Sequence, residues 1–139
     1  MVEVYAACES REISEEFLSW LTAGWNRAFE LLKGIGVGEV ATLDVMEVTL
    51  LDDGEMARLH GEFLADATTT DVITFEHGEL LIGVEVAARQ AKEFGSEEDR
   101  EIALYGIHGM LHLAGFDDVE TSDAEKMARR QEELLVRCF

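Results

Sequence analysis

Two histidines four residues apart constrain this chain more than any other feature. His108 and His112 lie in a segment expected to be helical from residue 102 to 114. Positions i and i+4 lie one above the other on the same helix face, so both imidazoles can give a nitrogen to one ion. The segment is apolar on most sides, which predicts a helix buried within the domain. A histidine pair on such a helix needs a partner, and a metal ion would satisfy it.

The residues after the second histidine supply a third ligand. Gly115 favours the left-handed conformation that ends a helix, so the chain can turn back there. Asp118 follows three residues later, and the pattern reads H-x3-H-x2-G-x2-D. Three nitrogen and oxygen ligands leave a fourth position open for water, as catalytic zinc sites require. We therefore predict a metal centre of His108, His112 and Asp118, with Asp117 as an alternative third ligand or as a residue that orients a ligand histidine.

The residue after the first histidine restricts the chemistry of such a centre. Metzincin-type zinc peptidases share the spacing H-x3-H-x5-D, but they carry a glutamate after the first histidine as general base. This chain has Gly109 there, which cannot take a proton. Metal-assisted hydrolysis of a phosphodiester is the reaction that this centre still predicts, because it needs no protein nucleophile. The catalytic base is not assigned, and Asp117 and Glu120, just past the turn, are candidates for it.

The segment from 108 to 118 resembles the signature of the YbeY family, bacterial single-domain metalloproteins described as rRNA maturation endoribonucleases. That signature reads H-G-x-L-H-L-x-G-[YF]-D-H, and this chain reads H-G-M-L-H-L-A-G-F-D-D. Residues 70–75, T-D-V-I-T-F, are similar to the family's T-D-V-L-S-F segment. Residues 78–82, G-E-L-L-I, are similar to its G-D-I-x-I strand. The resemblance covers nearly the whole chain.

Two positions depart from the family's pattern. The family's third histidine is Asp118 here, and a carboxylate is also a competent zinc ligand. The family carries an arginine after an aromatic residue upstream of T-D-V, where this chain reads Phe63-Leu64. The resemblance gives that arginine a part in activity as a phosphate ligand, a role that leucine cannot fill.

The resemblance implies a metal-dependent, single-strand-specific endoribonuclease that acts in rRNA maturation and ribosome quality control. Its cofactor would be Zn²⁺, or another divalent transition metal that takes similar ligands. Its partner would be rRNA or a ribosomal subunit, reached directly or through a protein. By the same resemblance Thr70 and Asp71 would line the metal cleft, while a turn or capping role is the alternative for Asp71. Leu64 and Asp118 keep a second hypothesis open: a catalytically impaired, metal-binding or ribosome-associated member.

The charge of the chain is strongly negative. Eleven Lys and Arg residues stand against 30 Asp and Glu residues, for a formal net charge of −19. Non-specific affinity for nucleic acids rests on basic contacts to phosphate, so such a surface repels RNA in general. Action on RNA would therefore need a local basic patch, a metal ion or a protein partner. Solubility and a saline environment are alternative reasons for the acidity.

The spacing of apolar residues predicts one α+β domain over residues 1–139, with a small mixed sheet packed with helices. The metal-ligand helix is expected against one face of the sheet, as in metzincins. The expected order is β-α-β-α-β-β-α-α-α. Strands are expected at 2–6, 43–51, 72–75 and 80–84, and helices at 13–32, from 53 on, at 85–94, at 96–114 and from 122 on.

Serines mark the expected starts of three helices. Ser14 or Ser10 precedes the first helix as a cap. Ser96 and Ser122 precede the last two, and Ser122 is followed three residues later by a glutamate, as in a capping box. We therefore expect these side chains to accept hydrogen bonds from the first backbone amides of the helices.

Other patterns exclude further classes. The run G-I-G-V-G at 34–38 follows a helix and lacks Lys-Ser/Thr, so it is interpreted as a flexible turn and no nucleotide cofactor is expected. No apolar run reaches 18 residues, which predicts no membrane span, and the first residues lack the basic region of a signal peptide. Cys8 and Cys138 form no disulfide framework, so a reduced, cytoplasmic setting is expected.

Overall fold

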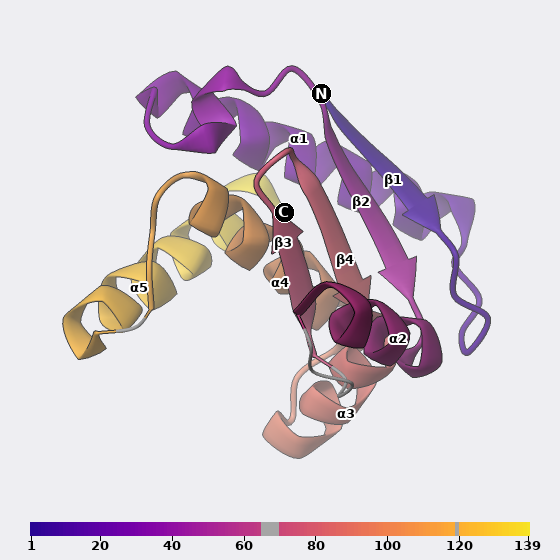
Figure 1. Ribbon diagram of the computed structural model, residues 1–139. Coiled ribbons are helices and arrows are strands. Elements are labelled where there is room, and N and C mark those ends of the chain that lie inside the picture. Colours follow the sequence, from indigo (N-terminus) through magenta and orange to yellow (C-terminus); the bar gives the residue numbers. More distant parts are fainter. Residues whose placement is uncertain (65–69, 119) are drawn as a thin grey trace.

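A four-stranded mixed sheet forms the centre of the molecule (Figure 1). The computed structural model describes residues 1–64, 70–118 and 120–139. The strands follow the order β1-β2-β4-β3 across the sheet, with β3 at one edge. Strands β1, β2 and β4 are parallel, and β3 runs antiparallel to β4. Their bounds are β1 Val2–Ala6, β2 Met46–Leu51, β3 Val72–Phe75 and β4 Glu79–Gly83.

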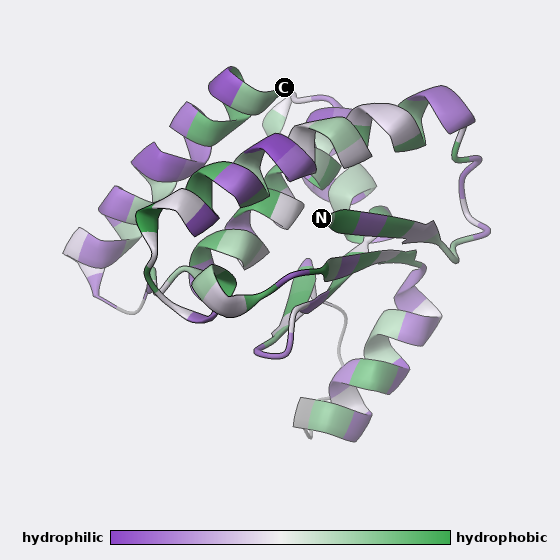
Figure 2. Cartoon of the chain, turned by 90° about the horizontal axis from the view of Figure 1, so that it is seen from above, coloured by the Kyte–Doolittle hydropathy of each residue, from purple (hydrophilic) through white to green (hydrophobic). Residues whose placement is uncertain are grey.

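Helices cover the two faces of the sheet unequally. Helices α1, α4 and α5 form the thick layer on one face, and α2 packs on the other (Figures 1 and 2). In Figure 2 the strand at the N label alternates green and purple along its first residues, and its burial decreases from the buried Val2 to the exposed Tyr5 and Ala6. The helices are α1 Glu15–Ile35, α2 Asp53–Leu64, α3 Val84–Phe94, α4 Glu98–Leu113 and α5 Thr121–Cys138, with a 3₁₀ turn, η1, at Glu39–Thr42.

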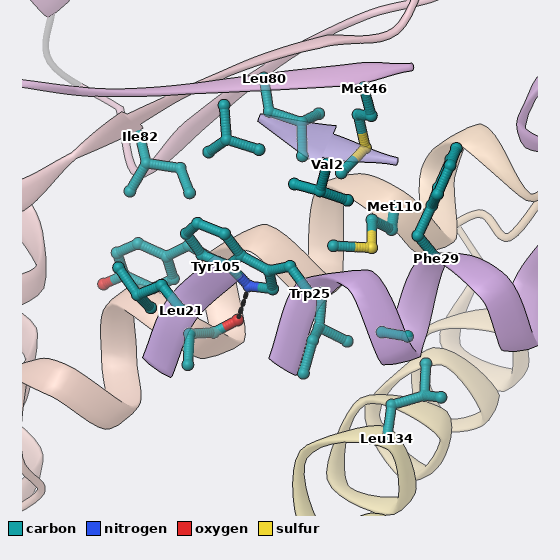
Figure 3. Packing of buried hydrophobic residues seen from close by; sticks show 14 of the residues in the cluster. Val2, Leu21, Trp25, Phe29, Met46, Leu80, Ile82, Tyr105, Met110 and Leu134 are labelled. Carbon is teal, nitrogen blue, oxygen red and sulfur yellow. Dashed lines mark hydrogen bonds between the residues drawn. The ribbon is translucent and has the colours of Figure 1, made fainter. Parts of the chain in front are cut away.

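The main core lies between the sheet and the helices α1, α4 and α5. Val48 and Leu50 of β2 pair in register with Leu80 and Ile82 of β4, and all four side chains are fully buried on this face. Period-2 alternation in the strands thus produces one apolar surface, as expected for a half-buried sheet. Figure 3 shows this surface meeting the helical side chains, with Trp25 of α1 among them.

Helix α4 approaches its neighbours closely at two glycines. The indole Nε1–H of Trp25 donates a hydrogen bond of 3.0 Å to the carbonyl of Ala103 (Figure 3). A Cβ atom at Gly106 would lie 2.3 Å from that indole, and one at Gly109 would lie 2.8 Å from the side chain of Leu80. Only glycine allows these distances, so the two positions let α4 lie against α1 and against the sheet. α4 is buried along most of its length, as predicted.

The α+β class and the predicted order of elements are confirmed, and one boundary region differs. The run at 34–38 is a structured helix end: α1 continues through Gly34 and ends at Gly36, which has φ 74°. Gly38 also has φ 74°, and its backbone lies against Leu113 and Ala114. The segment that follows α1 therefore packs against the end of α4. Strand β2 begins at Met46 and not at Leu43, because residues 43–45 form an irregular link between the 3₁₀ turn η1 and the strand.

The first predicted cap is confirmed and the other two are wrong. Ser14 accepts a hydrogen bond of 3.0 Å from the amide of Phe17. At the last two helices the N-cap residue is a glutamate without a side-chain capping bond. Ser96 instead donates to the carboxylate of Glu101 at 2.8 Å. Ser122 lies inside the first turn of α5, one residue beyond its start, where it cannot act as the cap.

Within the described part of the chain, no helix combines the length and the apolar character needed to cross a membrane.

Candidate metal centre

The last two turns of α4 place both predicted histidines on one face. The Nε2 atoms of His108 and His112 lie 3.1 Å apart. The ring centroids are 4.7 Å apart and the ring planes meet at 78°, so the two rings meet at their nitrogens and do not stack face to face. Both side chains are partly buried. The i, i+4 spacing therefore has the geometric result that the sequence predicts.

The chain turns back directly after α4. The amide of Gly115 donates to the carbonyl of His112 at 3.0 Å, and the amide of Phe116 donates to that of Leu111 at 2.9 Å. Gly115 has φ 92°, a conformation that a glycine adopts without steric cost. These bonds satisfy carbonyls at the helix end and reverse the chain. Asp118 is thereby returned to the histidines, with its Oδ2 atom 3.7 Å from Nε2 of His108.

The three predicted ligands offer atoms that fit one metal ion. One nitrogen from each histidine and one oxygen of Asp118 all lie within 4.8 Å of one another. Ligand atoms about 2.0–2.1 Å from a tetrahedral zinc ion would lie about 3.3–3.4 Å apart. The observed separations of 3.1 Å and 3.7 Å lie on either side of that value. The donor set, two imidazoles and a carboxylate, is also one that zinc accepts.

A side chain that the sequence reasoning missed completes the surroundings of the first histidine. The Nδ1 atom of His108 makes a hydrogen bond with Oε1 of Gln131, which lies on α5. By its spacing from Met127 and Leu134, Gln131 belongs to the packing face of the last helix. One sequence signal existed: Gln131 is the polar member of an otherwise apolar stripe that includes Met127 and Leu134.

The edge strand β3 borders α4 beside the histidines. A Cβ atom at Gly109 would lie 3.1 Å from the hydroxyl of Thr74, in the middle of β3. Thr74 pairs with Leu80 of β4, whose side chain also lies against Gly109. The T-D-V-I-T-F segment therefore lies alongside the ligand helix, and Thr74 is the residue of that strand placed closest to Gly109. The sequence reasoning did not single out Thr74.

The two predicted cleft residues lie at the start of β3 and make local contacts. Oδ1 of Asp71 accepts a hydrogen bond of 2.8 Å from the amide of Val72 and one of 3.4 Å from the hydroxyl of Thr70. The carbonyl of Asp71 accepts from the amide of Gly83 at 2.9 Å. These contacts agree with the turn or capping role that was the alternative for Asp71. A part in lining the metal cleft stays a prediction.

The assignment to a family follows from the whole sequence. The sequence model of the family described as Endoribonuclease YbeY matches residues 7–138, which include the metal motif and all of the sheet except the first strand. The chain belongs to the YbeY family. The resemblance carried by the helix motif is thereby confirmed.

Curated relatives and a solved structure agree with the YbeY assignment. An Endoribonuclease YbeY from Exiguobacterium sibiricum is 32% identical over 110 residues, covering 65% of this chain and 70% of the relative. One from Bacillus cereus is 27% identical over 146 residues, covering 91% and 90%. The solution structure of TM1509 from Thermotoga maritima has a TM-score of 0.68 at 23% identity, covering 97% of this chain and 87% of that one. At that identity the solved structure supports the fold.

The two candidate bases lie close to Asp118 in the chain. Asp117 and Glu120 are both exposed, one beside Asp118 and the other as the N-cap residue of α5. Their role as a base stays a prediction.

Tyr105 lies one turn before His108, and burial, followed by the charge of Glu101, raises the pKa of its phenol. Tyr105 is therefore a neutral phenol at ordinary pH and not a base.

The position of the family's arginine lies at the end of α2. Leu64 is the last residue of that helix, and its side chain is outside the described part of the structure. The preceding aromatic residue, Phe63, contacts Phe75 of β3 edge to face, with ring centroids 5.4 Å apart. Position 64 thus follows directly on a residue that packs against the edge strand.

Proposed function

We propose that this chain is a metal-dependent endoribonuclease that acts in rRNA processing. The YbeY assignment supports an endoribonuclease role in rRNA processing. The observation that carries the metal dependence is the convergence of His108, His112 and Asp118 on one point. Zinc is the proposed ion because the ligands are two imidazoles and a carboxylate at nearly tetrahedral spacing.

The residues of the centre would hold and position the ion. When bound, a divalent ion supplies Lewis-acid chemistry, since it lowers the pKa of water and polarises a phosphoryl oxygen. Asp118 neutralises one of its charges, whereas the family's third histidine would leave both uncompensated. Asp117 and Glu120 are the proposed acceptors for a proton at this edge, because they flank Asp118 in the chain.

Helix α5 carries basic and acidic residues in equal number. Lys126, Arg129, Arg130 and Arg137 are four of the 11 basic residues, and Asp123, Glu125, Glu132 and Glu133 lie on the same helix. Arg130 pairs with Glu133 at 3.0 Å, and the other basic side chains of α5 are the proposed contacts to RNA phosphates. Since the net charge is −19, we propose that a ribosomal subunit, or a protein bound to it, also brings the single-stranded RNA, in maturation and in quality control.

The experiment that tests this function compares RNA cleavage with metal content. Tag-free protein is stripped of metal, reloaded with zinc, and given the same rRNA fragment as a single strand and as a duplex. We expect about one zinc per chain and cleavage of the single strand only after reloading, with both lost in His112→Ala. Cleavage that persists without metal, or in the His112→Ala protein, would contradict the metal-dependent mechanism.

A second function, a family member that binds metal but cleaves nothing, is favoured by Leu64 and Asp118. It predicts zinc binding without cleavage in the wild type. The double substitution Leu64→Arg with Asp118→His would then create cleavage, because it restores both family residues. A zinc peptidase is the third hypothesis, and Gly109 argues against it because no base follows the first histidine.

A further inference from the structure

We infer that Gln131 is a positioning residue of the metal centre, which presets the tautomer of His108 so that its Nε2 lone pair faces the ion. The inference rests on the metal centre proposed above. It makes α5 a working part of that centre, although all three ligands lie on α4 or just after it.

The side chains of Gln131 and His108 contact each other directly. Oε1 of Gln131 faces Nδ1 of His108 across 23 residues of sequence. An amide oxygen only accepts hydrogen bonds, so Nδ1 must carry the proton. A neutral imidazole has one N–H, which leaves Nε2 of His108 without a proton. That unprotonated nitrogen is the one that faces His112 and Asp118.

The two histidines contact each other through their Nε2 atoms. Two unprotonated nitrogens would repel each other at 3.1 Å, so one of the two Nε2 atoms must donate. Since Gln131 leaves Nε2 of His108 as the acceptor, the donor in the metal-free protein is Nε2–H of His112. The two ligands are therefore unequal: His108 is ready for an ion, and His112 must move its proton to Nδ1 when an ion binds.

The opposite orientation of the amide is inconsistent with a metal ligand. With its NH₂ group toward His108, Gln131 would donate to Nδ1, and the proton of His108 would lie on Nε2. That nitrogen could then give no lone pair to an ion. The amide oxygen toward His108 is the arrangement that satisfies both the hydrogen bond and the ligand role.

Core packing of α5 holds the amide of Gln131 in place. Met127 lies one turn before Gln131 and Leu134 nearly one turn after it, and both are 1% exposed. These two side chains seat α5 in the main core, on the same helix face as Gln131. The position of the amide is thus set by core packing and not by the metal, as preorganisation of a ligand requires.

The experiment measures tautomers and zinc affinity separately. Long-range ¹H–¹⁵N NMR of the metal-free protein reports which ring nitrogen of each histidine is protonated. In the wild type we expect Nδ1–H at His108 and Nε2–H at His112. Gln131→Leu keeps the size but removes the acceptor, so His108 should become a mixture of tautomers. Gln131→Glu keeps an acceptor and should retain the wild-type tautomer.

Zinc affinity, measured by competition with a chromophoric chelator, gives the second readout. Gln131→Leu should weaken binding about 10- to 100-fold, the usual effect of losing a partner of a ligand histidine. Gln131→Glu should bind at least as well as the wild type. Gln90→Leu makes the same change in α3, the location of the chain's other glutamine, and should alter neither readout.

Each outcome decides the inference. A wild type with Nε2–H at His108, or a Gln131→Leu protein with unchanged tautomer and affinity, would overturn it. A wild type that binds no zinc but has the expected tautomers would refute the proposed metal-dependent function and leave the preset tautomer standing. Loss of affinity in Gln131→Glu as well as Gln131→Leu would overturn the acceptor role, because glutamate keeps both the size and the acceptor.

Discussion

At the scale of single residues, Asp118 is where the metal centre of this chain departs from the family's histidine. Its carboxylate is exposed and reaches His108 at 3.7 Å through a short turn. We expect Asp118→Ala to weaken zinc binding by more than about 100-fold, which exceeds the usual effect of an outer-shell change. Asp118→His should retain binding, because imidazole is an equivalent ligand. Competition titration with a chelator measures both.

The neighbouring carboxylate is the control for that prediction. Asp117→Ala removes the same group one residue earlier, outside the group of His108, His112 and Asp118, and should leave zinc affinity within about threefold of the wild type, well below a ligand effect. If Asp117→Ala abolishes binding and Asp118→Ala does not, Asp117 is the third ligand, the alternative that the sequence left open.

The residues of the centre differ in how far the sequence could predict them. His108 and His112 follow from the helix period, and Asp118 follows from a turn at a glycine. Gln131 at His108 and Thr74 at Gly109 could not be placed in this way, because they reach α4 through the packing of α5 and β3 on it. Short spacings in sequence predict contacts within one element, and contacts between elements need the tertiary fold.

At the scale of elements, the glycines of α4 set how closely it packs. Gly106→Ala would put a Cβ atom 2.3 Å from the fully buried indole of Trp25, which has no room to move. Gly109→Ala meets the end of the Leu80 side chain at 2.8 Å, and that end can shift. We expect Gly109→Ala to lower the free energy of unfolding by about 1–3 kcal/mol, and Gly106→Ala to lower it more.

A third glycine gives the matched control for the two in α4. Gly34 lies inside α1, and a Cβ atom there meets nothing within 4 Å. Gly34→Ala should therefore raise the free energy of unfolding by about 0.5–1 kcal/mol, the ordinary gain in a helix. Urea unfolding of the three variants measures the series. Equal losses at Gly106 and Gly34 would contradict the packing argument.

The helix starts give a second comparison at this scale. Ser14→Ala removes the bond from the amide of Phe17 and should lower the free energy of unfolding by about 0.5–2 kcal/mol. Ser122→Ala lies inside the first turn of α5 and should change it by less than about 0.5 kcal/mol. Thermal unfolding of both variants checks this, and a larger loss at Ser122 would support the capping box that the structure does not show.

The two serines also show why helix boundaries are hard to predict. The residues around Ser122 match a capping box, but α5 starts one residue earlier, at Thr121, with Glu120 as its N-cap. Local sequence identified the existence and order of the helices, whereas their first residues depend on the loops that lead into them.

At the scale of the whole molecule, the order of the strands in the sheet could not be predicted from the apolar pattern of the sequence. Periodicity identifies β1, β2, β3 and β4 as strands, but it does not say that β4 pairs with β2 while β3 takes the edge. Strand order follows from the parallel crossover through α1 and from the path through α2 to β3, which pairs antiparallel with β4, and the apolar pattern leaves both undetermined. That order is what brings β3 alongside α4 at Gly109, the residue that follows His108.

The same strand order gathers negative charge on the face of the sheet that faces away from α4. Glu3, Glu47 and Glu79 are direct neighbours across β1, β2 and β4. Glu3 accepts a hydrogen bond from the hydroxyl of Tyr5, and it raises the pKa of that phenol, with a further contribution from Glu47. Three like charges in one cross-strand row repel one another, so part of the net charge of −19 opposes folding at this row.

Reversing the central charge should stabilise the sheet. Glu47 is exposed and has a glutamate on each side, so Glu47→Lys replaces two repulsions by two attractions. We expect a gain of about 0.2–1 kcal/mol per pair in the free energy of unfolding, measured with urea at low salt. The gain should shrink at about 0.5 M NaCl, because salt screens exposed charges. Glu12→Lys changes the net charge equally outside the sheet, so an equal gain there would assign the effect to total charge and not to the row.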